Sequence, residues 1–589
     1  MNNYYYNDYF EIGQQKIANF NLYQIGLPED DAVYTLKKVL EELNFDQLTA
    51  RYSNKGRKGY NPIMMYALIV YANMRGVRSV DKIVELCERD ICFMWLAKGE
   101  RPKRDAFYNF MNDKATTYIM ENLHYQFVKI LEKEGLIFLK SLFIDGTKFE
   151  ANANRYTFVW RGSINYHLSN LLFSIEKIYE RYNKLLTSNG YDDKYSLHEE
   201  EMFVIEGIDK VREIIRKNKE RKLSKKKKIS NNKVIKISNI CPVKLLDLQT
   251  NLTKIAKEED IIFVEGRGQK KTELQRIYEK VEEYGERLMK YKESFEIMGD
   301  NRNSYSKTDV EATFMRMKED HMLNGQLKPA YNVQIAVENY FIIHTYVSSD
   351  RTDYNTLIPI IEKHHEMTGV KLEDITADSG YCSEKNLLYL KNNDIESYIK
   401  LQEHEKKKTR KYYQQIGKHY NMKRVEKTDA NGDNQVYYIC HANRELKLIR
   451  VETRREKGFS RTYKVYGCED CSGCKHKSEC LYNYDEDKDL EKNKVMKINE
   501  NWEELKKHSE KNILSEKGIK NRQIRSIQTE GHFGDIKEND GIRRFNHRSK
   551  KKVYKEMMFY VMGRNLNKYH RFLQGTLKRF EPKNTEKVA

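Results

Sequence analysis

The sequence predicts an α/β protein with a helical N-terminal region. Two short apolar runs are predicted to be strands that end at an aspartate soon followed by a glycine, at Asp145 and at Asp378. Between them, residues 331–347 have the alternation of a two-stranded hairpin, and residues 355–367 have the pattern of a helix. Strands that alternate with helices in this way favour a sheet covered by helices.

The region from residue 30 to residue 130 is predicted to be helical. Pro62 opens an apolar segment that closes at Gly76, and helices favour proline at the start and glycine after the end. Ser79 is a suitable N-cap for the next helix. Small helices joined by basic turns are compatible with a helix-turn-helix-like DNA reader, and a plain helical bundle is the alternative.

An inserted arm is predicted between the two aspartates. Apolar residues recur at alternating spacings of three and four from Leu168 to Leu185, and again from Leu274 to Phe295. Both runs are heptad seams, so the two helices are expected to pair antiparallel. The polar stretch between them contains a basic run that is either a solvated face or a phosphate contact. Its centre is formed by Lys225, Lys226, Lys227 and Lys228.

The composition favours a polyanionic partner. The 589 residues include 106 Lys and Arg against 87 Asp and Glu, with a formal charge of +19 and a pI near 9.1. No apolar run reaches the roughly 18 residues of a membrane span, and the N-terminus does not have the pattern of a signal peptide. We therefore expect an intracellular protein without a membrane partner, which makes nucleic acid the expected ligand.

The two aspartates and a later glutamate suggest metal chemistry. Glu530 lies on a predicted helix near the C-terminus. Carboxylates that converge repel one another unless a cation lies between them, and Mg²⁺ prefers such oxygen ligands. Two ions in one site stabilise the attacking and the leaving oxygen of a phosphodiester reaction. The alternative for each aspartate is an ordinary turn or cap residue.

A cluster of cysteines predicts a second metal site. Cys468, Cys471, Cys474 and Cys480 have the spacing C-x2-C-x2-C-x5-C, and Cys440 precedes them. Thiolates in tetrahedral array select Zn²⁺ or an iron–sulfur cluster, and five cysteines compete for four places. We expect a structural zinc site that stiffens a β-rich insertion.

Several long blocks resemble the DDE transposases of bacterial insertion sequences. FIDGTKFEANANRYTFVW, TADSGYCSEKNL and IQTEGHFGDIKENDGIRRF are similar to the catalytic blocks of that family, and KTDVEATFMRMKEDHMLNGQLKPAYNVQIAVE to the block before its central hairpin. The N-terminal block from YNPIMMYALIVY to LAKGERP is similar to the helical domain of InsH-like transposases. The resemblance covers most of the chain in the family's order.

The resemblance implies a fold and a division into domains. It implies an RNase H-like catalytic core formed by residues 131–160, 326–400 and 515–575. A helical DNA-binding domain (1–130), a coiled-coil-like helical insertion (161–325) and a zinc-bearing β-rich insertion (401–514) would complete the chain.

The resemblance also implies roles for individual residues. Asp145, Asp378 and Glu530 would be catalytic and would hold two Mg²⁺ ions, with Mn²⁺ as a substitute. Lys537 matches a lysine that contacts the transposon end, whereas Ser526 holds the place of the family's arginine and leaves Arg525 as the nearest substitute. The favoured zinc ligands are Cys440, Cys471, Cys474 and Cys480, with Cys468 as the spare.

Trp160 is a further candidate DNA contact. It follows the first aspartate and could stack on an unpaired base near the cut. As an aromatic residue in a strand, it is equally suited to a place in the core.

The implied function is transposition. The protein would bind the terminal inverted repeats, cleave the ends and join the 3′-OH to target DNA, as a homodimer in the synaptic complex within the bacterial cytoplasm and nucleoid. The alternatives are a transposase-derived DNA-binding protein without catalysis and a metal-dependent DNA nuclease.

Overall fold

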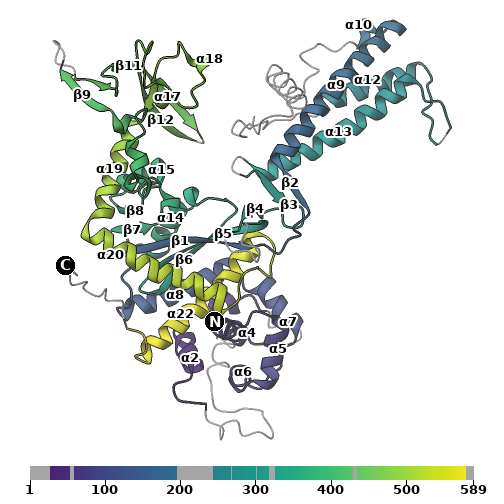
Figure 1. Ribbon diagram of the computed structural model, residues 1–589. Coiled ribbons are helices and arrows are strands. Elements are labelled where there is room, and N and C mark those ends of the chain that lie inside the picture. The colour runs from purple at the N-terminus through teal and green to yellow at the C-terminus, as the bar shows by residue number, and fades with distance from the viewer. Residues whose placement is uncertain are drawn as a thin grey trace.

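The computed structural model describes eight stretches of the chain, with a core, an arm and a second sheet (Figure 1). The described residues are 27–52, 59–195, 243–266, 268–299, 302–317, 325–428, 434–456 and 458–578. The arm and the second sheet extend from the side of the core opposite the N-terminal helices. No helix among these described residues is long and apolar enough to cross a membrane.

A mixed six-stranded sheet forms the centre of the core. Its order is β4-β5-β1-β7-β8, and β6 also pairs with β5. Strand β1 is antiparallel to β5 and parallel to β7, which is parallel to β8. The strand bounds are β1 Ser141–Glu150, β4 Thr313–Arg316, β5 Leu327–Glu338, β6 Phe341–Ser348, β7 Asp374–Ala377 and β8 Glu396–Ile399.

The predicted hairpin is confirmed as β5 and β6. Asn339 and Tyr340 connect the two strands with φ angles of 46° and 69°. Two central residues with positive φ give a turn whose twist matches that of the flanking strands. The predicted helix after the hairpin is confirmed as α14 (Leu357–Thr368).

The N-terminal helices pack against the same apolar core as this sheet. Asn61 and Ser79 cap the predicted helices α4 (Pro62–Met74) and α5 (Val80–Arg89) with their side chains. The long C-terminal helix α22 (Lys550–Leu573) lies between α4 and the sheet, and a Cβ added at Gly563 would lie 2.8 Å from the backbone nitrogen of Met74. One apolar cluster therefore joins the N-terminal helices to the core. The other N-terminal elements are α2 Ala32–Glu42, α3 Asp46–Thr49, α6 Ile91–Leu96, α7 Arg104–Asn109, the π-helix η1 Phe110–Lys114 and α8 Thr117–Lys133.

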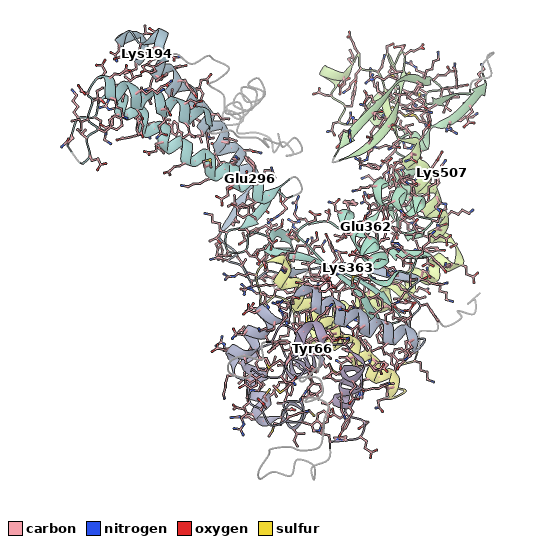
Figure 2. All side chains as sticks on the ribbon, turned by 180° about the vertical axis from the view of Figure 1, so that it is seen from behind. Tyr66, Lys194, Glu296, Glu362, Lys363 and Lys507 are labelled. Atoms are coloured by element: carbon pink, nitrogen blue, oxygen red, sulfur yellow. The ribbon has the colours of Figure 1, made fainter. Side chains whose placement is uncertain are left out.

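The arm contains the two predicted helices and a third one. The two heptad seams lie on α9 (Arg161–Asn189) and α13 (Glu273–Met298), and their buried residues share one cluster. Helix α12 (Val243–Glu258) adds a stripe of four residues that the sequence analysis missed, namely Leu245, Leu248, Leu252 and Ile255. Figure 2 places Lys194 near the far end of the arm and Glu296 near its base. The short helix α10 (Asp192–Tyr195) and strands β2 (Phe158–Trp160) and β3 (Ser304–Ser306) lie at the two ends of the arm.

The segment with the cysteines forms a five-stranded antiparallel sheet of its own. The order is β13-β12-β11-β10-β9, which is also the reverse of the order along the chain. A β-rich insertion was expected here. Helix α19 (Glu500–Leu514) then leads back to the core. The strands are β9 Lys423–Thr428, β10 Asn434–Ile439, β11 Glu445–Glu456, β12 Phe459–Cys468 and β13 Val495–Ile498.

Candidate active site

The register of the central sheet brings Asp145 and Asp378 together. Ile144 of β1 pairs with Ala377 of β7, and each aspartate is the next residue along its chain. In parallel strands, residues at the same level point to the same face of the sheet. The two aspartates therefore lie at one level of the sheet, Asp145 within β1 and Asp378 directly after the last residue of the neighbouring strand β7.

The prediction that the first strand ends at Asp145 is wrong. Strand β1 continues to Glu150 because β5 pairs with it over this whole length, with Asp145 opposite Ile335 and Glu150 opposite Ala330. It is the parallel neighbour β7 that ends here, at Ala377. The pairing of β1 with β7 therefore stops at Ile144, and Asp145 lies just beyond it.

Glu530 reaches the same place from a helix, as predicted. This helix begins as α20 (Glu516–Arg525) and continues through a π-helical segment, η7 (Ser526–Glu530). It goes on through α21 (Gly531–Gly534) into a second π-helical segment, η8 (Asp535–Asn539). Segment η7 lies against β1 and β5. π-Helical turns of this kind are frequent at functional sites.

Arg525 lies between two of the carboxylates. Its Nη1 is 2.9 Å from Oδ2 of Asp145, and its Nη2 is 3.3 Å from Oε1 of Glu530. An α-helical projection places Arg525 nearer the side opposite Glu530, whereas in the structure the two side chains are in contact. The wider π-turn places residues five apart on one face, so Arg525 and Glu530 point the same way.

Burial dominates the electrostatics of Asp145. It raises the pKa of this carboxyl, and the positive charge of Arg525 and a hydrogen bond from the backbone N–H of Gly146 oppose the rise. The negative charges of Asp378 and Glu530 act in the same direction as burial. All three carboxylates thus interact electrostatically in one site.

Polar side chains behind the carboxylates fix their surroundings. Gln334 donates from Nε2 to Oδ1 of Asp353 at 2.8 Å and accepts a hydrogen bond from the hydroxyl of Tyr381. A Cβ added at Gly146 would lie 2.2 Å from this amide, so only glycine fits beside Asp145. The backbone N–H of Gly380 donates to Oδ1 of Asp378 at 2.7 Å.

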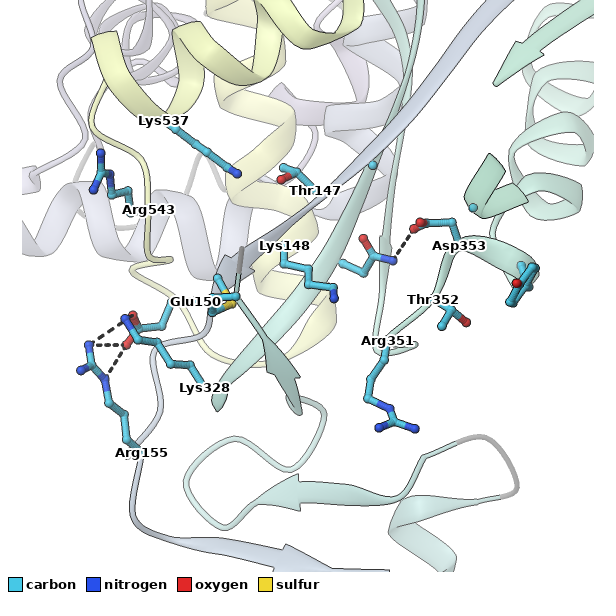
Figure 3. A pocket seen from close by; sticks show the side chains of 15 residues that line it. Thr147, Lys148, Glu150, Arg155, Lys328, Arg351, Thr352, Asp353, Lys537 and Arg543 are labelled. Atoms are coloured by element: carbon cyan, nitrogen blue, oxygen red, sulfur yellow. Dashed lines mark hydrogen bonds and ion pairs between the residues drawn. The ribbon is translucent and has the colours of Figure 1, made fainter. Parts of the chain in front are cut away.

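A basic pocket of about 300 Å³ adjoins the carboxylates (Figure 3). Glu150 accepts hydrogen bonds from Arg155 at 3.0 Å and from Lys328 at 3.2 Å, and so holds two cations at one wall. Cationic side chains outnumber the two acidic ones, Glu150 and Asp353. The cationic residues that line the pocket are Lys148, Arg155, Lys328, Arg351, Lys537 and Arg543.

The other predicted DNA contacts have different positions. Lys537 lines the basic pocket, with Nζ 5.9 Å from the ring centre of Phe149, and Figure 3 shows it directed towards Thr147. Trp160 packs at the base of the arm, with ring centres of Phe158 and Phe314 at 5.8 and 5.7 Å. The predicted contacts Lys225, Lys226, Lys227 and Lys228 lie outside the described residues.

The donor set of the carboxylate site suits a hard divalent cation. Asp145, Asp378 and Glu530 offer only oxygen ligands, which Mg²⁺ and Mn²⁺ accept. Across the described ranges, however, no three or more His, Cys, Asp or Glu side chains converge as the ligands of one metal ion. The guanidinium of Arg525 lies between Asp145 and Glu530 and accounts for their separation.

The five cysteines of the second sheet line one small cavity of about 20 Å³. The thiol of Cys468 donates to the backbone oxygen of Asp470 at 3.1 Å, and the sulfur of Cys471 accepts from the backbone N–H of Lys494 at 3.4 Å. These thiols also form no ligand group for a metal within the described parts of the chain. The zinc site therefore stays a prediction.

The sequence analysis missed several residues of the site. Arg155 and Lys328 stand in blocks that carried the family resemblance, but only the fold places them around Glu150. Asp353 follows the hairpin in a turn without any motif, and it lines the basic pocket. No local signal identifies these three residues, because their role depends on contacts between distant segments.

The sheet places Asp145 and Asp378 at one level, Arg525 links Asp145 to Glu530 on a helix, and a basic pocket lies beside them. A basic pocket of this kind suits polyanionic ligands. Comparison with protein families then specifies the class of protein. Residues 439–570 match the family described as Transposase DDE domain, and residues 22–113 match the Transposase domain (DUF772). Both matches are to transposase families, which supports the resemblance to DDE transposases of insertion sequences. The first match includes Glu530, whereas Asp145 and Asp378 lie before it. No curated protein matches the chain.

Proposed function

We propose that this protein is an active DNA transposase. It binds the terminal inverted repeats of its element, cleaves the DNA ends and joins the freed 3′-OH to target DNA. The observation that carries the proposal is the placement of Asp145 on β1 at the level of Asp378, which directly follows β7, with Arg525 linking Asp145 to Glu530. The two matches to transposase families, at residues 22–113 and 439–570, support the same function.

The central sheet is proposed to be an RNase H-like core. Its order β6-β5-β1-β7-β8 has three antiparallel strands followed by two parallel ones, and the carboxylates lie on the central pair. Such a core keeps the backbone beneath the carboxylates rigid, because β1 is paired on both sides up to Ile144. A rigid backbone is required to hold metal ligands in a fixed geometry.

Asp145, Asp378 and Glu530 would hold two Mg²⁺ ions. When bound, such ions activate the attacking water or 3′-OH and stabilise the leaving oxygen. The residues of the chain position these ligands. Gly146 fixes one oxygen of Asp145 through its backbone N–H, and the hydroxyl oxygen of Thr529 lies 3.3 Å from the other oxygen.

The basic pocket is proposed to bind the DNA backbone beside the cut. Its six cations surround the stretch of β1 that follows Asp145, so a strand that lies in the pocket would extend from the catalytic carboxylates. Lysine and arginine contacts of this kind position DNA without reading its sequence. Joining two ends requires two active sites, and we therefore propose that the protein acts as a homodimer on the nucleoid.

The cysteines of the second sheet are proposed to bind structural zinc. Five thiols that line one cavity are a donor set for Zn²⁺. We propose Cys440, Cys471, Cys474 and Cys480 as the ligands. Cys468 is the spare because its thiol already donates to a backbone oxygen.

Cleavage assays test the proposal. The purified chain is incubated with Mg²⁺ and a labelled duplex that ends in the inverted repeat flanking the gene. Cleavage followed by joining supports transposition. Cleavage alone would make the protein a nuclease, and binding alone a DNA-binding protein without catalysis.

A further inference from the structure

Arg525 spans two of the three carboxylates with its two terminal nitrogens. It donates one N–H to Asp145 and another to Glu530. The remaining oxygens of this pair also have donors, since Gly146 N–H binds Oδ1 of Asp145 at 2.8 Å and Ser526 binds Oε2 of Glu530 at 3.0 Å. Every oxygen of Asp145 and Glu530 is thus engaged by the protein itself.

The π-helical segment builds this bridge. Arg525 and Glu530 are five residues apart, which an α-helix would separate by about 140° around its axis. The π-turn aligns them, and the hydroxyl of Thr529 closes the turn by donating to the backbone oxygen of Arg525 at 2.7 Å. The contact between Arg525 and Glu530 therefore depends on the geometry of the helix and not only on the conformation of the Arg525 side chain.

The two halves of the bridge differ in burial. The side chains of Arg525 and Asp145 are each 15% exposed, whereas Glu530 is 58% exposed. Ion pairs in exposed positions contribute little, and partly buried pairs contribute more. The more exposed ion pair, between Arg525 and Glu530, is therefore expected to break first. A bound metal ion then has to replace Arg525 at the more buried Asp145.

A guanidinium cannot lose its charge by deprotonation in a protein. It also cannot share the space between two carboxylates with a divalent cation, because like charges at that distance repel strongly. Metal loading and the observed position of Arg525 exclude each other.

We propose that Arg525 is a built-in counter-cation that competes with divalent metal for Asp145 and Glu530. This inference rests on the proposed function. On metal loading the guanidinium leaves the carboxylates and becomes free to pair with a DNA phosphate, which favours planar, bidentate partners of this kind. Metal binding and DNA binding then favour each other, because each ligand stabilises the displaced Arg525.

Mn²⁺ titration of the full-length protein tests this inference. Free Mn²⁺ is measured by electron paramagnetic resonance without DNA, for the wild type, Arg525→Gln and the matched control Arg276→Gln on the arm. Arg525→Gln is expected to bind Mn²⁺ about tenfold more tightly than the wild type, since loss of a competing ion pair of about 1.4 kcal/mol changes a binding constant tenfold. Arg276→Gln is expected to match the wild type, and Arg525→Lys to fall between them because one ammonium cannot span both carboxylates.

Adding the flanking-repeat duplex gives a second readout. DNA should tighten Mn²⁺ binding to the wild type and leave binding to Arg525→Gln nearly unchanged. An unfolding transition first shows that each Arg525 variant is folded. If the wild type and both variants then bind Mn²⁺ with equal affinity, the inference is wrong and the proposed function is unaffected. If Asp145→Asn and the wild type bind Mn²⁺ equally weakly, the proposed function and the inference both fail.

Discussion

Ile144 and Ala377 face each other across two parallel strands, and each is followed directly by an aspartate. This register places the carboxylates of Asp145 and Asp378 at one level although 232 positions lie between them in the sequence. A shift of one residue in either strand would turn one carboxylate to the other face. The chemistry proposed here therefore depends on this pairing.

Replacement of either aspartate should remove cleavage and preserve binding. Asp145→Asn and Asp378→Asn should each lower the rate of end cleavage by more than about a hundredfold, because an amide is a poor ligand for a hard cation. Affinity for the repeat duplex should change little. Asp394→Asn is the matched control, since Asp394 is 85% exposed and pairs only at the surface with Lys371. Loss of folding or of DNA binding in Asp145→Asn would instead assign that residue a structural role.

The raised pKa of Asp145 predicts a pH-dependent difference in stability. Burial raises this pKa above that of the unfolded chain, which is about 4. Between the two values the folded protein keeps a proton that the unfolded chain has released, so the contribution of Asp145 to the free energy of unfolding falls as the pH rises through this window. In metal-free buffer, Asp145→Asn should therefore unfold at a higher temperature than the wild type at neutral pH. The difference should disappear below pH 4, and a difference that is constant over the pH range would contradict this account.

Gly146 has no room for a side chain. A Cβ there would meet the amide of Gln334 at 2.2 Å, so Gly146→Ala should lower the free energy of unfolding by about 1–3 kcal/mol and displace the adjacent Asp145. Chemical denaturation and cleavage assays measure the two effects. Gly162→Ala in helix α9 is the control, because an added Cβ meets nothing within 4 Å there. Equal stability of both variants would show that the network around Gln334 adapts.

Glu150 is expected to be a structural anchor of the basic pocket. The side chains of Glu150 and Lys328 are 9% and 10% exposed, and removal of one partner from a buried ion pair costs about 3 kcal/mol. Glu150→Gln should therefore destabilise the protein by about this amount in urea denaturation. Glu405→Gln, which removes a carboxylate that is 62% exposed, should change stability much less, because exposed ion pairs contribute little. Similar values for both variants would mean that Glu150 is effectively solvated.

The proposed zinc site can be tested on the purified protein. Cys474→Ser should lose the metal measured by elemental analysis, whereas Cys468→Ser should retain it, because serine can also donate to the backbone oxygen of Asp470. A chelator should lower the unfolding temperature of the wild type and have no effect on Cys474→Ser. Several equivalents of iron with a matching amount of inorganic sulfide, in place of zinc, would identify an iron–sulfur cluster. No metal in the wild type would end the proposal.

Much of the local structure was predictable from the sequence. Asn61 and Ser79 cap helices where the pattern placed them, and Asn339 turns the hairpin. The heptad seams from Leu168 and from Leu274 meet in the arm as expected. Caps, turns and periodic apolar faces are properties of a few neighbouring residues, so the sequence displays them directly.

The site was predictable only in part. The identities of Asp145, Asp378 and Glu530 came from blocks similar to a known family, while their geometry came from strand pairing. Arg525 illustrates the limit, because an α-helical projection places it on the wrong side of the helix and the π-turn corrects this. A π-turn is not predicted by any short-range sequence pattern. In the structure this turn packs against β1 and β5, which are distant in the sequence.

The sequence by itself predicted most of the elements, the family resemblance and the candidate metal ligands. Tertiary structure decided that β1 runs past Asp145 while β7 stops beside it, that Glu150 gathers Arg155 and Lys328, and that Arg525 bridges two carboxylates. The physical reason is that charge interactions depend on distances between atoms in space. Those distances are set by strand register and helix phase, which link residues hundreds of positions apart.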